Sequence, residues 1–247
     1  MKLRELVPKR LRLRYQLVRR YWKYDLLADW RYANGPHWNL DRPQFSIELA
    51  IRKSPLYENK VHNLRLASRR ISGLLIRPEE VFSFWRTIGP PTARNGFRKG
   101  RNLIGGVLLE DYGGGLCQLS GLTYYLALKA DLHILERWNH SVDIYDEASR
   151  FTPLGTDAAV AYGYKDLLVR NNRPYPIRFG IEVCEQSIIG TLHSEGPIEE
   201  GQLHFTIREE ASGLRVTGYR ADGEQINESV YAKPPETDRS NTSIIRT

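Results

Sequence analysis

One cysteine stands directly after a run of three glycines, in the segment Gly113-Gly114-Gly115-Leu116-Cys117-Gln118. Glycine adopts left-handed backbone conformations without strain, so this run favours a sharp turn that leads into a helix. The first turn of a helix carries unpaired N–H groups and the positive end of the helix dipole, and both stabilise an anion. The pKa of a thiol placed there falls below its free value of about 8.5, and the thiolate is the nucleophile. The spacing therefore predicts Cys117 as a nucleophile.

A cysteine nucleophile also needs a base, and His140 follows 23 residues downstream, beyond the predicted helix. A third group should orient that base. Asp157 and Asp143 are both candidates, because Asp157 opens an apolar run and Asp143 lies on the same predicted strand as Ser141. Backbone N–H groups of the glycine turn and of Cys117 could then bind an oxyanion.

Each of these residues also has a structural interpretation, which the sequence leaves open. A single cysteine is often a small buried apolar residue, and Cys184, inside an alternating strand pattern, is expected in the core. His140 could be a hydrogen-bonded structural histidine, and Asp157 a turn or strand-cap residue.

Other kinds of site are disfavoured. The glycine run 113–115 is not followed by Lys-Ser or Lys-Thr, so it is not a nucleotide-binding P-loop. No CxxC or HExxH spacing occurs and the six histidines are scattered, so we expect neither a metal nor a cofactor. Two cysteines allow at most one disulfide, and we expect both thiols to be reduced.

Periodicity indicates which elements position these residues. With 247 residues, 41% hydrophobic and 26% charged, the chain can bury a sizeable core. Helical spacing runs from Asn59 to about Leu75 and again from Leu116 to near Ala130, whereas residues 89–106 resemble a loop. Strands are predicted at 45–51, 81–85, 132–137, 141–145, 158–163, 166–171, 175–183, 188–193, 203–208, 214–219 and 225–231. The prediction is an α+β fold, with helices of the N-terminal half packed on a mostly antiparallel β-sheet from the C-terminal half.

The positive charge of the chain is concentrated at its N-terminus. Residues 1–31 contain ten basic and three acidic side chains, which equals the net charge of +7 for the whole chain. The remaining residues are balanced, which argues against a nucleic-acid partner. We divide the chain into a basic arm (1–33), the main domain (34–195), a β-hairpin extension (196–233) and a loose tail (234–247).

The arm itself has a helical apolar stripe among arginines, formed by Leu11, Tyr15, Val18, Trp22 and Leu26. One interpretation is docking on an anionic inner-leaflet membrane surface, and the other is a stripe that packs on the body. A third interpretation is a docking site for another protein, built from Trp22, Tyr24, Trp30, Tyr32 and Trp38.

The sequence resembles the VanW family over roughly residues 57–193. The resemblance rests on a set of short motifs: Arg77-Pro78, Phe82-Ser83-Phe84-Trp85, Gly113 to Gln118, Glu136-Arg137 with His140, Gly155, Asp157-Ala158, Asp166-Leu167 and Arg170-Asn171. Some exported members of this family are linked to L,D-transpeptidase activity in the cell wall. By resemblance, Cys117 would attack a peptidoglycan stem peptide with His140 as base, and the substrate-binding residues would be Gly113, Gly114, Gly115, Gln118 and Arg137.

Location is the point at which this chain departs from the exported members. Its first 30 residues lack an apolar export segment, so we expect a cytoplasmic protein at the inner membrane face. The substrate would then be a precursor that carries the stem peptide. The alternative from another class is a non-catalytic accessory protein that binds peptidoglycan or its precursor, and in either case the resemblance implies an association with glycopeptide resistance.

Overall fold

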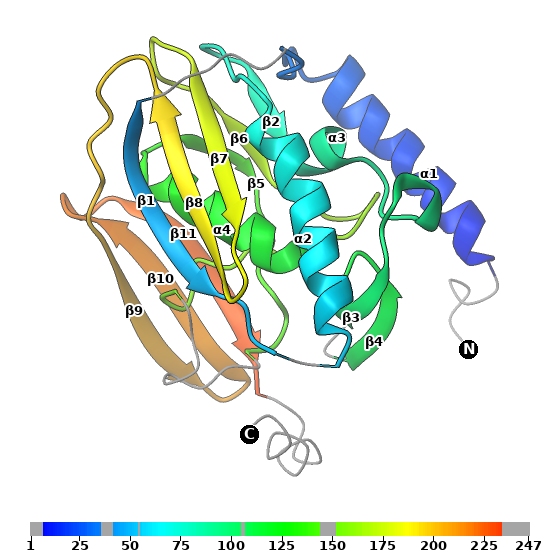
Figure 1. Ribbon diagram of the computed structural model, residues 1–247. Coiled ribbons are helices and arrows are strands. Elements are labelled where there is room, and N and C mark those ends of the chain that lie inside the picture. Colours follow the sequence, from blue (N-terminus) through cyan, green and yellow to red (C-terminus); the bar gives the residue numbers. More distant parts are fainter. Residues whose placement is uncertain (1–6, 36–41, 54, 105–106, 144–151, 234–247) are drawn as a thin grey trace.

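The computed structural model describes residues 7–35, 42–53, 55–104, 107–143 and 152–233. Its elements form the predicted α+β fold, with α-helices in the N-terminal half and antiparallel sheets mostly from the C-terminal half (Figure 1). The α-helices are α1 (Lys9–Tyr21), α2 (Tyr57–Ser72), α3 (Phe84–Ile88) and α4 (Leu116–Lys129). The strands are β1 (Pro43–Ala50), β2 (Val81–Ser83), β3 (Lys99–Ile104), β4 (Val107–Tyr112), β5 (His133–Glu136), β6 (Leu168–Arg170), β7 (Ile177–Val183), β8 (Ser187–Ser194), β9 (Leu203–Glu210), β10 (Gly213–Arg220) and β11 (Gln225–Ala232).

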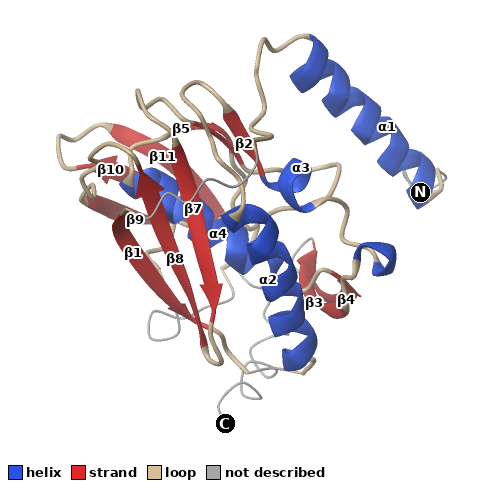
Figure 2. Cartoon of the chain, turned by 45° about the horizontal axis from the view of Figure 1, so that its top comes forward, coloured by secondary structure: helices blue, strands red, loops and turns tan. Residues whose placement is uncertain are grey.

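The strands form antiparallel ladders in the orders β1-β8-β7, β2-β6-β5, β11-β10-β9 and β3-β4. Helix α2 lies along β7, where Ser72 Oγ accepts a hydrogen bond from the Ile181 N–H at 2.8 Å (Figure 2). Helix α4 meets β8 at Gly190, which faces Leu122 where a Cβ would lie 2.8 Å from Leu122 Cγ. Both helices therefore pack against the β1-β8-β7 sheet.

The main core surrounds α4, because this helix is apolar on most of its circumference. Leu119, Leu122, Leu126 and Ala127 are all fully buried in it. A helix that is apolar all round belongs inside a domain rather than on its surface. The thiol of Cys117 is thus carried by the most deeply enclosed helix of the fold.

Two of the predicted segments differ from the elements that the structure shows. The predicted strand 81–85 ends at Ser83, because the Ser83 hydroxyl accepts the Arg86 N–H and caps α3 instead. The predicted loop 89–106 is wrong, because it contains β3, which pairs with β4 in a hairpin. This hairpin depends on contact with the glycine turn, where Gly100 and Gly114 meet, and not on alternating apolar residues.

The predicted strands 141–145 and 158–163 are also wrong for the residues that the structure describes. Val142 makes only an isolated parallel bridge to Ala232, and Ala161 bridges to Lys165 across a tight turn. Asn59, predicted as a helix cap, lies in the first turn of α2 and donates to the Lys99 carbonyl. The strands predicted around 168, 177, 188, 203, 214 and 225 are confirmed with shifted ends.

The C-terminal extension is a three-stranded meander rather than a hairpin. Strands β9, β10 and β11 share a small core in which Leu154, Val216 and Tyr231 are buried. Residues 234–247, predicted as a loose tail, lie outside the described residues.

The predicted helix of the basic arm is confirmed as α1, followed by a π-helical turn, Trp22–Leu26. Its stripe of Leu11, Tyr15, Val18, Trp22 and Leu26 is 53–65% exposed, so the interpretation that this stripe packs on the body is wrong. Among the other aromatic residues of the arm, Tyr24 stacks on Trp30, and its carbonyl accepts a hydrogen bond from the Tyr32 hydroxyl. Trp38 lies outside the described residues. In the part of the chain that is described, no helix has the length and apolar character needed to cross a membrane.

Candidate active site

The three glycines form the turn that the sequence predicts. Gly113 and Gly115 have φ values of 85° and 98°, a left-handed conformation that favours glycine. Gly114 lies against the backbone of Gly100, where a Cβ would approach the Gly100 Cα to 2.6 Å. The side chain of Asn63 ties this turn to the preceding segment, because its amide donates to the Gly114 and Arg98 carbonyls. The glycines thus position α4, and a direct role for them in substrate binding stays a prediction.

Cys117 is the second residue of α4 and is partly exposed. Its thiol donates to the carbonyl oxygen of Val160 at 3.8 Å, and the imidazole of His140 is near enough to affect its ionisation. Burial raises the pKa of the Cys117 thiol, but the hydrogen bond and the charge of His140 lower it more, so the net pKa lies below its usual value. The thiol is therefore poised to ionise.

His140 is bound on its other side by Asp157. The Asp157 Oδ2 atom accepts the His140 backbone N–H at 2.7 Å and the ring Nδ1 at 2.6 Å. Since Nδ1 is occupied in this way, Nε2 is the ring nitrogen left for Cys117. Burial lowers the pKa of His140, yet the hydrogen bonds and negative charges of Asp157 and Cys117 raise it to about 10.

The second oxygen of Asp157 is also held. Asp157 Oδ1 accepts a hydrogen bond from Arg137 at 2.9 Å and another from the Tyr231 hydroxyl. Burial raises the pKa of Asp157, but His140, Arg137 and Tyr231 together lower it to about 2. Asp157 is therefore a fixed anion that orients the imidazole and stabilises its protonated form.

Arg137 is a positioning residue in this arrangement. Its guanidinium donates to the carbonyl oxygens of Asp157 and Gly155 and to the Ser229 hydroxyl, besides the Asp157 carboxylate. Only 7% of its side chain is exposed. Substrate binding by Arg137 stays a prediction, since the structure shows its contacts to the protein itself.

Backbone donors lie at the start of α4. Within the described part of the chain, the N–H groups of Gly115 and Cys117 donate to no acceptor. Gln118 donates through Nε2 to the Ala50 carbonyl at 2.8 Å, which leaves its buried Oε1 without a partner among those same residues. Beside this turn, burial and the charge of Arg52 lower the pKa of Lys60 to about 8.

The structure brings Cys117, His140 and Asp157 together, as predicted from their types and spacing. Of the two candidate carboxylates, Asp157 is the one that contacts His140, and a role for Asp143 stays a prediction. Sequence reasoning missed Tyr231, Ser229 and the Val160 carbonyl. No local signal points to Tyr231, because β11 reaches the site only through tertiary packing.

A second polar cluster joins α1 to the body. Arg20 makes a bidentate pair with Glu136 at 2.9 and 3.0 Å, and its guanidinium lies 3.7 Å from Asp166. Asp166 accepts hydrogen bonds from the Ser83 hydroxyl and the Trp85 N–H. Burial raises the pKa of Asp166 to about 6, although these hydrogen bonds oppose that effect.

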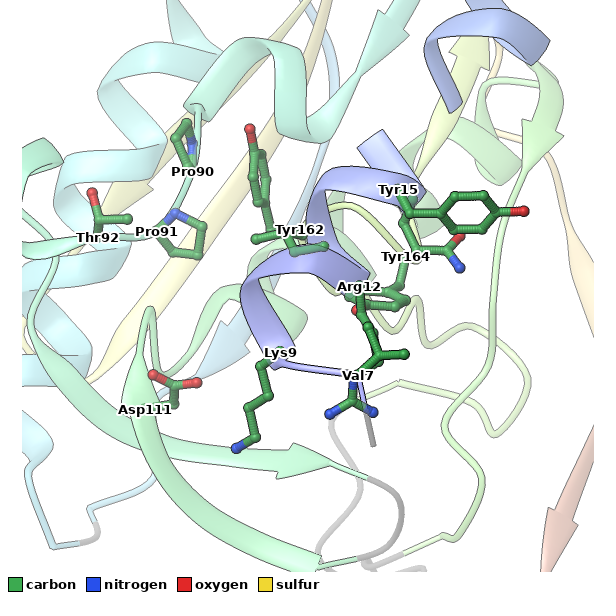
Figure 3. Close-up of a pocket in the computed structure, with 12 residues that line it drawn as sticks. Val7, Lys9, Arg12, Tyr15, Pro90, Pro91, Thr92, Asp111, Tyr162 and Tyr164 are labelled. Atoms are coloured by element: carbon green, nitrogen blue, oxygen red, sulfur yellow. The ribbon is translucent and has the colours of Figure 1, made fainter. Parts of the chain in front are cut away.

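A cavity of about 690 Å³ lies between α1 and the body (Figure 3). Its lining includes Lys9 and Arg12 of the helix, together with a wall that contains Pro91 and Tyr162 (Figure 3). This wall adjoins the candidate active site, because Pro91 packs beside Gly113 and Tyr162 follows Val160 by two residues. Cys117 itself does not line the cavity.

A family model described as VanW like protein matches residues 59–193, which is more than half of the chain. The chain belongs to the VanW family. The matched region contains Cys117, His140 and Asp157, whereas α1 and the β9-β10-β11 meander lie outside it.

Two curated relatives of this VanW-family chain show the extent of the similarity. The chain is 35% identical over 138 residues to a protein of Enterococcus faecalis named Vancomycin B-type resistance protein VanW, covering 56% of this chain and 50% of that protein. It is 30% identical over 141 residues to the Bacillus subtilis protein named Uncharacterized protein YoaR, covering 57% and 45% respectively. The chain spans about half the length of these relatives. No solved structure matches it.

Proposed function

We propose that this VanW-family protein is a cysteine-dependent acyl-transfer enzyme that acts on peptides of the peptidoglycan pathway. The observation that carries the proposal is the series Cys117, His140 and Asp157, in which the imidazole of His140 lowers the pKa of the Cys117 thiol and hydrogen-bonds to Asp157. A nucleophile, a base within hydrogen-bond reach and a third group that orients the base form the arrangement that nucleophilic catalysis requires.

The proposed reaction begins with attack of the Cys117 thiolate on a peptide carbonyl. The C–N bond then breaks, the protonated His140 gives its proton to the departing amine, and a thioester forms on Sγ. An acceptor amine attacks the thioester, loses a proton to His140 and leaves with the acyl group, which restores the thiolate. The N–H groups of Gly115 and Cys117 are the proposed donors to the oxyanion in both steps.

The peptidoglycan substrate class is supported by the family resemblance. The Enterococcus faecalis relative is named for vancomycin resistance, and we extend an association with glycopeptide resistance to this chain as part of the proposal. In the cytoplasmic location expected from the sequence, the substrate would be a precursor that carries the stem peptide.

A non-catalytic precursor-binding protein is the second candidate. The observation that favours it is the cavity beside α1, because Cys117 does not line this cavity and a bound peptide there need not meet the thiol. The two candidates differ in what Cys117 contributes, so one substitution separates them.

The test uses a Cys184→Ala background, so that Cys117 is the sole thiol. Alkylation by a small neutral reagent is followed from about pH 5 to about pH 9, with and without His140→Ala. We expect the midpoint of reactivity to rise by about 1 to 3 pH units when the imidazole is removed. An unchanged profile would contradict the thiolate pair.

The same proteins are then incubated with a stem pentapeptide and an acceptor amine, and intact mass and products are recorded. An enzyme forms an acylated species on Cys117 and loses turnover in Cys117→Ser. If Cys117→Ser binds the peptide as tightly as the parent and no acylated species or product forms, the binding-protein candidate is the correct one.

A further inference from the structure

Helix α1 has two apolar faces on opposite sides. At about 100° per residue, Leu13 and Leu17 project from the side of the helix opposite to Leu11 and Val18. The exposure pattern agrees with this geometry, because Leu13 and Leu17 are partly buried whereas Leu11 and Val18 are 53% and 56% exposed. An ordinary surface helix has one apolar face, which packs on the core.

The inner face accounts for the attachment of α1 to the body. Leu13 and Leu17 lie against Gly163, where a Cβ would approach Leu13 Cδ1 to 2.5 Å. One turn further on, Arg20 is paired with Glu136 and Asp166. These contacts hold the helix at the edge of the molecule, on the side away from the β9-β10-β11 meander (Figure 1).

The outer face is therefore left without a partner in the described chain. Tyr15 and Trp22 are 65% and 57% exposed, and Leu11 and Val18 extend the same row. Four large apolar side chains in one row are more than the single exposed apolar residues that a soluble surface usually carries. Tryptophan and tyrosine are also the residues enriched at the boundary between lipid and water.

The charges around this row are all positive. No acidic residue occurs between Lys9 and Tyr24, and the first acid after α1 is Asp25. Arg20 is used in the inner contacts, and Lys9 and Arg12 line the cavity between α1 and the body. Four other cations remain: Arg10, Arg14, Arg19 and Lys23. An apolar row bordered by cations matches a surface that offers hydrocarbon below a layer of negative charge.

We propose that the outer face of α1 docks in the plane of an anionic lipid bilayer. In this arrangement Tyr15 and Trp22 enter the boundary of the acyl chains, and the flanking arginines contact the anionic headgroups. Charge complementarity favours lipid over a second copy of this chain, because two copies would bring two sets of like charges together. The proposal does not depend on the proposed acyl transfer, since none of the catalytic candidates lies on α1.

The test is cosedimentation of the full chain with phosphatidylglycerol-containing vesicles and with pure phosphatidylcholine vesicles, at about 0.1 M and about 1 M salt. We expect binding to the anionic vesicles at low salt, and its loss at high salt or with neutral vesicles. Tyr15→Ser with Trp22→Ser should weaken binding by about tenfold or more. Arg14→Gln with Arg19→Gln should do the same, because each basic residue near the surface adds to the attraction.

Matched controls come from exposed residues elsewhere. Ile207→Ser with Val230→Ser removes two exposed apolar side chains from the meander, and Arg65→Gln with Arg69→Gln removes two exposed cations from α2. Both control proteins should bind as the parent does. Circular dichroism checks that all four proteins keep their helix content. The proposal is overturned if anionic vesicles are not bound, if both α1 variants bind like their controls, or if the parent sediments by self-association without lipid.

Discussion

One carboxylate oxygen of Asp157 binds His140 twice, through the backbone N–H at 2.7 Å and through the ring Nδ1 at 2.6 Å. The backbone contact fixes where the residue sits, and the ring contact fixes how the imidazole is turned. Because both contacts use Oδ2, the other oxygen is available to Arg137 and Tyr231, which hold the carboxylate from behind. The orientation of His140 toward Cys117 therefore depends on residues from three separate parts of the chain.

Replacement of Asp157 by Asn is expected to raise the pKa of the Cys117 thiol. The amide keeps the shape but removes the charge that stabilises protonated His140, and the thiolate then loses its cationic partner. The charge of Asp157 also repels the thiolate, but this effect is smaller than the hydrogen bond to His140. Alkylation at pH 7 should slow by about tenfold, which corresponds to about one pH unit. An alkylation profile identical to that of the parent would show that Asp157 does not act through His140.

Replacement of Tyr231 by Phe removes one donor from the Asp157 carboxylate. Arg137 remains in place, so we expect a loss of about 1.5–3 kcal/mol in the free energy of unfolding, as for a hydrogen bond to a charged group. Tyr219→Phe on β10 is the control, because the ring of Tyr219 stacks on that of His204 and phenylalanine keeps this contact. Urea denaturation measures both proteins, and equal stability of the two would contradict the role given to Tyr231.

The free energy of unfolding at acid pH should also depend on Asp157. Its folded pKa of about 2 lies below the unfolded value of about 3.9, so its contribution is complete above about pH 4 and is lost as the pH falls toward 2. That contribution is about 2 kcal/mol. Denaturation at several pH values should show this loss in the parent and its absence in Asp157→Asn.

The contribution of Asp166 to stability is expected to have the opposite pH dependence. Its folded pKa of about 6 lies above the unfolded value of about 3.9, so the folded state holds a proton that the unfolded state releases between these values. Stability from this group is present below about pH 4 and falls as the pH rises to about 6. Asp166→Asn can keep its contacts to Ser83 and Trp85, and it should remove this part of the pH dependence. If the stability of Asp166→Asn still falls between about pH 4 and about pH 6, another group causes this pH dependence.

Arg20 and Arg19 provide a comparison of neighbours on α1. The Arg20 side chain is 19% exposed and its partner Glu136 is 6% exposed, so Arg20→Met leaves a buried carboxylate unpaired and should cost about 3 kcal/mol. Arg19 points outward, and Arg19→Met should change stability by less than about 0.5 kcal/mol. Limited proteolysis should cut within α1 faster in Arg20→Met only. Equal cleavage rates would mean that other contacts hold the helix.

Gly114 and Gly121 should respond oppositely to alanine. A Cβ on Gly114 would lie 2.6 Å from the backbone of Gly100, so the turn must shift and both stability and thiol reactivity should fall. A Cβ on Gly121, inside α4, meets its nearest neighbour at 3.7 Å, and Gly121→Ala should be neutral or stabilise by up to about 1 kcal/mol. Thermal unfolding and alkylation measure both effects. If Gly114→Ala keeps the stability and thiol reactivity of the parent, the close approach of Gly100 does not exclude a Cβ from this turn.

Several features of this protein follow from the sequence alone because they are local. Left-handed glycines before an apolar helical repeat place Cys117 in the first turn of α4, whatever the rest of the chain does. Alternation of apolar residues likewise identifies β7 and β8, whose inner side chains are buried. Helix α1 of the basic arm also follows from a local pattern, because its apolar residues recur at helical spacing.

Tertiary structure decided the features that depend on which distant segments meet. The predicted loop contains the β3-β4 hairpin, because contact between Gly100 and Gly114 positions it rather than a pattern of its own. Asp157 contacts His140, and Tyr231 joins Asp157 from β11, because tertiary packing brings these distant segments together. On α1 both faces are apolar, so spacing cannot say which face packs. The pairing of Arg20 with Glu136 made that choice, since a buried carboxylate requires a charged partner.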